Sequence, residues 1–156
     1  MIHIINRWTI QQDQVLVLSA TSVRLYTELD NIDSEEGIEK FALALEDRFG
    51  PRPRVVEELF EGLRLRWIAR SLGFDRVTLK TTVLRCYFHK NAQSAYYESA
   101  IFDRLIKLLG SKGRVLDIQL KQSATRLLMI KEKIKSMKSA REFLLSLQQM
   151  TEQETV

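Results

Sequence analysis

The sequence predicts an α+β domain in which several helices pack on a small antiparallel sheet. Apolar residues recur at helical spacing in some segments and at alternate positions in others, and the alternating segments come in pairs. The 156 residues, 45% of them apolar and 28% charged, suit one hydrophobic core. We therefore expect a single domain over residues 1–156, with poorly ordered ends at 1–14 and 151–156.

The N-terminal stretch is expected to contain short elements. Alternating apolar side chains predict strands at Ile2–Ile5 and Val15–Leu18, and a short helix is expected around Val23–Leu29.

The first long helix has clear start and stop signals. Asp33 can cap its N-terminus, with Glu36 reaching back from the third position, and the Gly50-Pro51 pair ends it. Its apolar residues recur at helical spacing and should be buried: Ile38, Phe41, Ala42, Leu45 and Phe49.

A second long helix follows at once. Pro53 suits its first turn, and Gly73 suits its C-terminal cap. Its apolar stripe is so wide that burial on more than one side is expected, with Leu63 at the centre. The stripe consists of Val56, Leu59, Phe60, Leu63 and Trp67, widened by Leu65, Ile68 and Leu72.

Two hairpins are predicted where the periodicity changes to two. The first joins Arg76–Lys80 to Val83–Phe88 through a turn at 81–82, although that turn lacks the usual Gly or Asn. The second joins Arg114–Lys121 to Thr125–Ile130.

Two further helices complete the prediction. Ser94 can cap a helix that Gly110 closes, and Ser139 with Glu142 forms a capping box for the last one. From Thr151 onwards the tail is polar and should fray. The expected buried faces are Tyr97, Ile101, Leu105 and Leu108, and then Phe143, Leu144, Leu147 and Met150.

No constellation of residues predicts catalysis. His3 and His89 have no Cys or His partner at ligand spacing, so metal binding is not expected. The six glycines form no phosphate-binding loop, and Cys86 lies in an apolar run that predicts a buried, inert thiol. We therefore expect no enzyme activity, no metal and no cofactor.

The sequence shows no signal for export or membrane insertion. No apolar run approaches the roughly 18 residues that span a bilayer, and residues 1–7 lack the features of a signal peptide. A single cysteine agrees with a reducing compartment. The expected location is the cytoplasm, with no membrane partner.

Charge is distributed unevenly along the chain. Residues 1–50 contain four Lys/Arg and nine Asp/Glu, whereas residues 51–156 contain 20 and 11. From Lys112 to Arg141 there are nine basic and two acidic residues, enough for weak DNA contact, but no aromatic residue that could stack on a base. A small basic nucleic-acid-binding module is therefore the alternative function.

The acidic end of the first long helix favours a protein-binding site. Glu46 and Asp47 fall in its last turn, where the helix dipole disfavours carboxylates. Arginines on a partner would explain them, and so would internal neutralisation by Arg48 or neighbouring helix ends. The two readings are equally supported by the sequence.

Three segments carry a resemblance to a known family. Residues 47–53 read Asp-Arg-Phe-Gly-Pro-x-Pro, and residues 64–73 read Arg-Leu-Arg-x-x-Ala-x-x-Leu-Gly. Residues 24–29 read Arg-Leu-Tyr-x-x-Leu, two residues shorter than the similar family segment. The chain resembles the C-terminal domain of the bacterial transcription-repair coupling factor Mfd.

The resemblance implies a function. The family is a DNA translocase that removes stalled RNA polymerase and recruits the repair protein UvrA; its motor lies upstream of this domain. The resemblance implies that this chain is a non-catalytic part of such a protein. It also implies that acidic residues at the end of the Asp-Arg-Phe-Gly helix dock the domain on the UvrA-binding module and mask it.

At the docking helix the sequence departs from the family. Asp47 matches one family carboxylate, whereas the other, three residues earlier, falls on Ala44. The docking contact is therefore either weaker than in the family or shifted to Glu46, and the resemblance assigns it to Asp47, Glu46 and Arg48.

Overall fold

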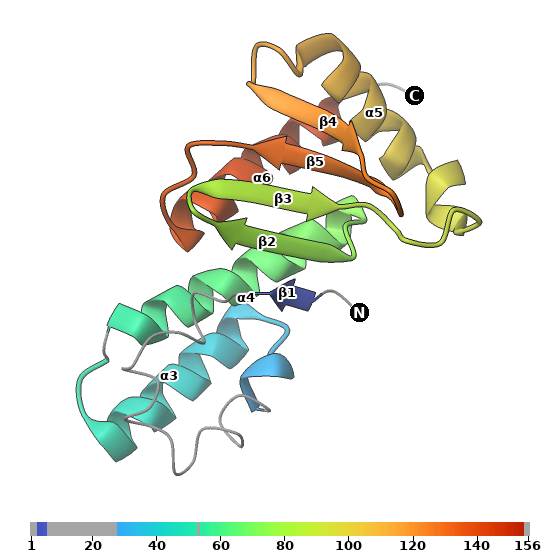
Figure 1. Cartoon of the computed structure of the whole chain (residues 1–156). Coiled ribbons are helices and arrows are strands. Elements are labelled where there is room, and N and C mark those ends of the chain that lie inside the picture. The colour runs from blue at the N-terminus through green and yellow to red at the C-terminus, as the bar shows by residue number, and fades with distance from the viewer. Residues whose placement is uncertain (1–2, 6–27, 53, 155–156) are drawn as a thin grey trace.

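The computed structural model describes residues 3–5, 28–52 and 54–154, and Figure 1 shows the arrangement of their elements. Helices and strands pack together as the α+β prediction requires. The predicted strand Val15–Leu18 and most of the predicted helix Val23–Leu29 lie outside the described residues. The elements are β1 (His3–Ile5), α3 (Glu35–Phe49), α4 (Arg54–Leu72), β2 (Arg76–Lys80), β3 (Val83–Tyr87), η2 (Ala95–Glu98), α5 (Ala100–Lys112), β4 (Ile118–Gln122), β5 (Leu127–Lys131) and α6 (Met137–Gln153).

The strands form one sheet in the order β1-β2-β3-β5-β4. Strands β2 to β5 are antiparallel to their neighbours, which confirms the predicted sheet and both hairpins. β1 joins β2 in parallel, with Ile4 beside Val77. The strand predicted near the N-terminus therefore adds a parallel edge to an otherwise antiparallel sheet.

The larger hydrophobic core lies between one face of the sheet and helices α4, α5 and α6. In Figure 1, α4 and α6 run behind the sheet. Cys86 is fully buried in this core, as expected from its apolar run, and burial raises the pKa of its thiol. The sheet contributes Val77, Leu79, Leu84, Cys86, Ile118 and Met129.

A second, smaller core lies between α3 and α4. Leu63 is buried there, as predicted for the centre of the α4 stripe, while Leu65 on the same helix is buried in the larger core. The prediction that α4 is buried on more than one side is thus confirmed. The smaller core consists of Leu29, Ile38, Ala42, Leu45, Val56, Phe60 and Leu63.

Ion pairs attach α3 and the turn before it to α4. Arg64 donates two hydrogen bonds to Glu35, from Nε to Oε1 at 2.6 Å and from Nη2 to Oε2 at 3.0 Å. This contact lowers the pKa of the Glu35 carboxyl. Bidentate pairing of this kind fixes orientation as well as distance. Arg66 donates a single hydrogen bond to Asp30, from Nη2 to Oδ1 at 2.9 Å.

The caps of two helices differ from the sequence prediction. Ser34, not Asp33, caps α3: its backbone is extended and its side chain accepts from the Gly37 N–H at 3.1 Å. Ser136, not Ser139, caps α6 and accepts from the Ser139 N–H. Starting α6 at Met137 places that apolar side chain in the core, which outweighs the local capping-box signal.

The end of α6 also corrects the prediction. Thr151 was expected to begin a frayed tail, but the helix continues to Gln153 and Thr151 is buried. Its hydroxyl donates to the Leu147 carbonyl at 2.7 Å. A buried, hydrogen-bonded side chain explains why the last turn is helical.

The helix predicted from Ser94 to Gly110 is divided in the structure. Ser94 caps the short η2, and Ser99 then caps a separate α5 that continues past Gly110 to Lys112. Ser99 has an extended backbone, which breaks the helix and turns Ile101 to the solvent. Leu105 and Leu108 are buried as predicted.

The second hairpin is shorter than predicted. Residues 114–117 form a turn, so β4 begins at Ile118 and Val115 is 86% exposed rather than part of a strand. β5 begins at Leu127, two residues after the predicted start. Asp117, with φ 55°, turns the chain into β4.

The turn of the first hairpin has a strained backbone, and substitution can relieve that strain. Thr81 and Thr82 have φ values of 50° and 61°, a region that β-branched residues rarely adopt but that an Asn-Gly turn favours. We expect Thr81→Asn/Thr82→Gly to raise the free energy of unfolding by about 1–2 kcal/mol. Urea denaturation measures this, with Thr78→Gly inside β2 as a control that should lower stability. A loss of stability in the turn variant would contradict the assigned backbone.

Candidate functional site

The predicted site lies at the C-terminal end of α3. Gly50 ends the helix with φ 83°, and its N–H donates to the Glu46 carbonyl at 2.8 Å. Glycine adopts this backbone without strain. The chain then turns away to α4, so the last turn of α3 stands at one end of the molecule (Figure 1).

Glu46 is neutralised inside the molecule. Its Oε1 accepts from Arg52 Nε at 2.8 Å, and Arg52 also pairs with Glu57 at 2.8 Å. The hydrogen bond to Glu46 raises the pKa of Arg52. Local structure therefore explains Glu46.

Local structure does not explain Asp47 in this way. Its side chain is exposed, and no hydrogen bond or ion pair joins it to another described residue. Arg48, which could have neutralised it, instead lies over the Phe49 ring at 5.3 Å from the centroid. Among the described residues, Asp47 is thus an unpaired carboxylate at the unfavourable end of a helix dipole.

Two exposed apolar side chains lie on the same helix. Phe49, the last residue of α3, was predicted to be buried, but it is 47% exposed. Leu43, one turn before Asp47, is 61% exposed. Sequence reasoning missed Leu43 as a site residue, although its position off the buried stripe of α3 was a usable signal.

The other motif of the resemblance has mainly a packing role. Leu65, Ala69 and Leu72 are buried, and the arginines of the motif pair with Glu35 and Asp30. Gly73 has φ 91°, and a Cβ there would lie 1.9 Å from the Tyr96 ring. Of the two segments that resemble the family, residues 64–73 are therefore packed mainly inside the domain, whereas residues 47–49 are exposed at the surface.

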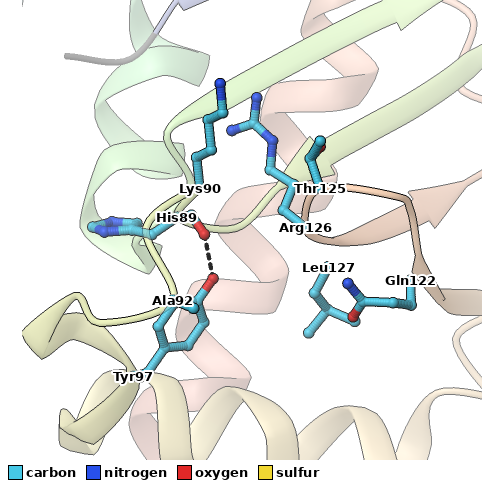
Figure 2. Close-up of a pocket in the computed structure, with 8 residues that line it drawn as sticks. All are labelled: His89, Lys90, Ala92, Tyr97, Gln122, Thr125, Arg126 and Leu127. Carbon is cyan, nitrogen blue, oxygen red and sulfur yellow. Dashed lines mark hydrogen bonds between the residues drawn. The ribbon is translucent and has the colours of Figure 1, made fainter.

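A pocket of about 280 Å³ lies where β3 and β4 end and β5 begins, and Figure 2 shows the residues that line it. His89 Nδ1 is 2.9 Å from Ser94 Oγ, and the Tyr97 hydroxyl donates to the His89 carbonyl. Arg126 pairs with Asp75 at 2.5 Å. The lining contains cations and amides but no carboxylate or thiol: His89, Lys90, Ala92, Tyr97, Gln122, Thr125, Arg126 and Leu127.

The basic segment Lys112–Arg141 does not form one stripe. Lys131 donates to the Leu116 carbonyl and lies over the Phe143 ring, on the helix side of the sheet. Arg141, on α6, pairs with Glu61. The cations of this segment are therefore divided between faces of the molecule.

Two further features of the described residues bear on the expected partners. Within residues 3–5, 28–52 and 54–154, no three His, Cys, Asp or Glu side chains gather as metal ligands would. In the same part of the chain, no helix has the length and apolar character needed to span a bilayer.

Comparison with known proteins identifies the family. The family model of the TRCF domain matches residues 18–99, more than half of the chain. A crystal structure of the C-terminal domain of a transcription-repair coupling factor has a similar fold: the TM-score is 0.60 at 17% sequence identity, over 92% of this chain and 89% of that one. No curated protein matched. The chain therefore belongs to the TRCF domain family and has the fold of the C-terminal domain of transcription-repair coupling factors.

Proposed function

We propose that this chain is a non-catalytic regulatory domain of a cytoplasmic transcription-repair coupling factor. It docks on the UvrA-binding module of its parent protein and thereby limits recruitment of UvrA until the parent engages RNA polymerase and DNA. All 156 residues act as one domain in this proposal. The motor activity belongs to the rest of the parent protein.

The unpaired Asp47 is the observation that carries the proposal. A carboxylate in the last turn of a helix costs about 0.3–1 kcal/mol unless a cation offsets the dipole, and the described residues supply no such cation to Asp47. An arginine on a partner surface would supply it by a charge-assisted hydrogen bond. Glu46, paired with Arg52, is assigned to local structure instead.

The surroundings of Asp47 also suit a protein partner. Leu43 is exposed and lies one turn before it, on the same face of α3. An apolar side chain beside a charged anchor is typical of a docking surface, because it contributes burial while the charge sets orientation. Glu36 and Glu39 on the same helix are exposed and extend the negative charge.

Binding in trans tests this docking surface. We expect the isolated chain to bind the isolated UvrA-binding module in calorimetry, with an affinity that falls as salt rises. Leu43→Ser should weaken binding about tenfold, because burial of a leucine side chain contributes roughly 1.5–3 kcal/mol. Val115→Ser removes an equally exposed apolar side chain elsewhere and should bind as the wild type does. Absence of binding, or equal losses in both variants, would contradict the proposal.

A further inference from the structure

One face of the sheet is not covered by any helix among the residues that the structure describes. The register places side chains of β2, β3, β5 and β4 in rows across this open face. In Figure 1 the described helices α4 and α6 lie on the other side. The rows are Arg76, Tyr87, Leu128 and Lys121; then Thr78, Arg85, Ile130 and Gln119; then Lys80 and Val83.

The open face is basic. It carries Arg76, Lys80, Arg85 and Lys121, and none of the strand residues of β2 to β5 is Asp or Glu. These four cations have no ion pair with any residue that the structure describes. Asp75, Asp117 and Glu132 are the nearest carboxylates in sequence, and each stands directly outside a strand end.

Tyr87 holds two guanidinium groups on this face. Arg76 lies over its ring at 5.3 Å from the centroid and Arg126 at 5.1 Å. The Nε of Arg76 is buried without a hydrogen-bond partner among the described residues. Leu128, beside Tyr87 in the row, is 5% exposed and belongs to neither core.

The basic surface continues into the pocket of Figure 2. Arg126 reaches from Tyr87 to the pocket wall, where Lys90 also stands. Gln122 and Thr125 add hydrogen-bonding side chains to the same wall. Arg126 thus links the open face to the pocket, although Asp75 offsets its charge, so among the described residues Lys90 adds the free cation at this end.

We propose that this open face binds single-stranded nucleic acid, independently of the docking function. The unpaired cations would neutralise phosphates, and the guanidinium planes held by Tyr87 would stack on bases. A single strand combines regularly spaced phosphates with a base at every nucleotide, a combination that an acidic protein segment lacks. A duplex fits less well, because the major groove admits a helix or a two-stranded ribbon, whereas this face is three strand spacings, about 14 Å, wide.

The sequence did not reveal this surface, for a reason that the structure shows. The basic segment Lys112–Arg141 lacks an aromatic residue, and only Lys121 and Arg126 of that segment reach the open face. Tyr87 and the other cations come from the first hairpin. Pairing of β3 with β5 brings the two hairpins together.

Fluorescence anisotropy with labelled 12-mers of oligo-dT and oligo-U tests the proposal, and separates DNA from RNA. We expect binding by the 156-residue chain with log Kd rising with log salt at a slope of about 2–3, since each phosphate contact on a single strand contributes about 0.7. Arg85→Met/Lys121→Met keeps the apolar stems and removes two charges. This double variant should weaken binding about tenfold or more at low salt and lower the slope of log Kd against log salt by about 1.4.

A matched control removes two exposed charges from the helices instead. Lys112→Met/Lys138→Met makes the same change in net charge on α5 and α6 and should retain wild-type affinity. Equal losses in the two variants, no binding to either oligomer, tighter binding to a duplex, or equal binding to polyglutamate would each overturn the proposal. Melting of both variants checks that the fold is retained, and Arg85→Lys should restore most of the affinity.

Discussion

Reversal of the charge at Asp47 is expected to increase the open form of the parent coupling factor by about ten- to a thousandfold. The expectation rests on the proposed docking of Asp47 against an arginine of the UvrA-binding module. Asp47→Arg replaces attraction with repulsion in a contact that docking partly desolvates, and this change is on the order of 2–4 kcal/mol. Each 1.4 kcal/mol shifts the docking equilibrium tenfold. Capture of UvrA by the parent protein should rise accordingly.

Melting of the isolated domain separates docking from stability. Asp47 has no described partner inside the domain, and arginine suits a helix C-terminus, so Asp47→Arg should melt at the wild-type temperature or slightly above it. Glu142→Arg on α6 makes the same charge change at another exposed site and should leave UvrA capture unchanged. If Asp47→Arg leaves UvrA capture unchanged, Asp47 has no autoinhibitory role. A marked fall in melting temperature would show instead that the carboxylate is structural.

Truncation of α4 leucines is expected to cause the largest losses of stability. Leu63 lies in the core shared with α3, and Leu65 lies in the core shared with the sheet. Leu63→Ala and Leu65→Ala should each lower the free energy of unfolding by about 2–5 kcal/mol, because each leaves a cavity. Since one helix carries both side chains, both variants should shift one cooperative transition in urea.

Leu43→Ala provides the control for these truncations. It removes the same atoms from an exposed position on α3 and should change stability by less than about 0.5 kcal/mol. A loss under about 1 kcal/mol in Leu63→Ala would show that Leu63 contributes little to the core. Two separate transitions, with Leu63→Ala affecting only the first, would show that the two cores unfold independently and would contradict a single domain.

Local signals in the sequence were reliable where they concern the backbone itself. Gly50 and Gly73 end their helices with positive φ, as a residue without a Cβ allows. Alternation of apolar residues located both hairpins, even though Thr81 and Thr82 are poor turn residues. Two caps were misplaced, because serines one and three residues from the predicted caps satisfy the same helix ends.

The site could be predicted only in part. The dipole argument selected Glu46 and Asp47 together, and the structure alone separates them, because Arg52 lies six residues beyond Glu46 in sequence but within hydrogen-bonding distance of it. Phe49 was expected to be buried and Val115 to lie in a strand, but both are exposed. Burial depends on how neighbouring elements are arranged in space. Neither effect is visible in the spacing of residues along one helix or strand.

The sequence by itself determined the α+β class, the wide burial of α4, the lack of any catalytic motif and the resemblance to a family, because each depends on the order and spacing of residue types. Only the tertiary structure decided which charges are paired and which share a surface. The open face combines cations of two hairpins that are separated by η2 and α5 in the chain. Their meeting depends on the pairing of β3 with β5, a contact between segments more than 40 residues apart, and local periodicity carries no information about such long-range contacts.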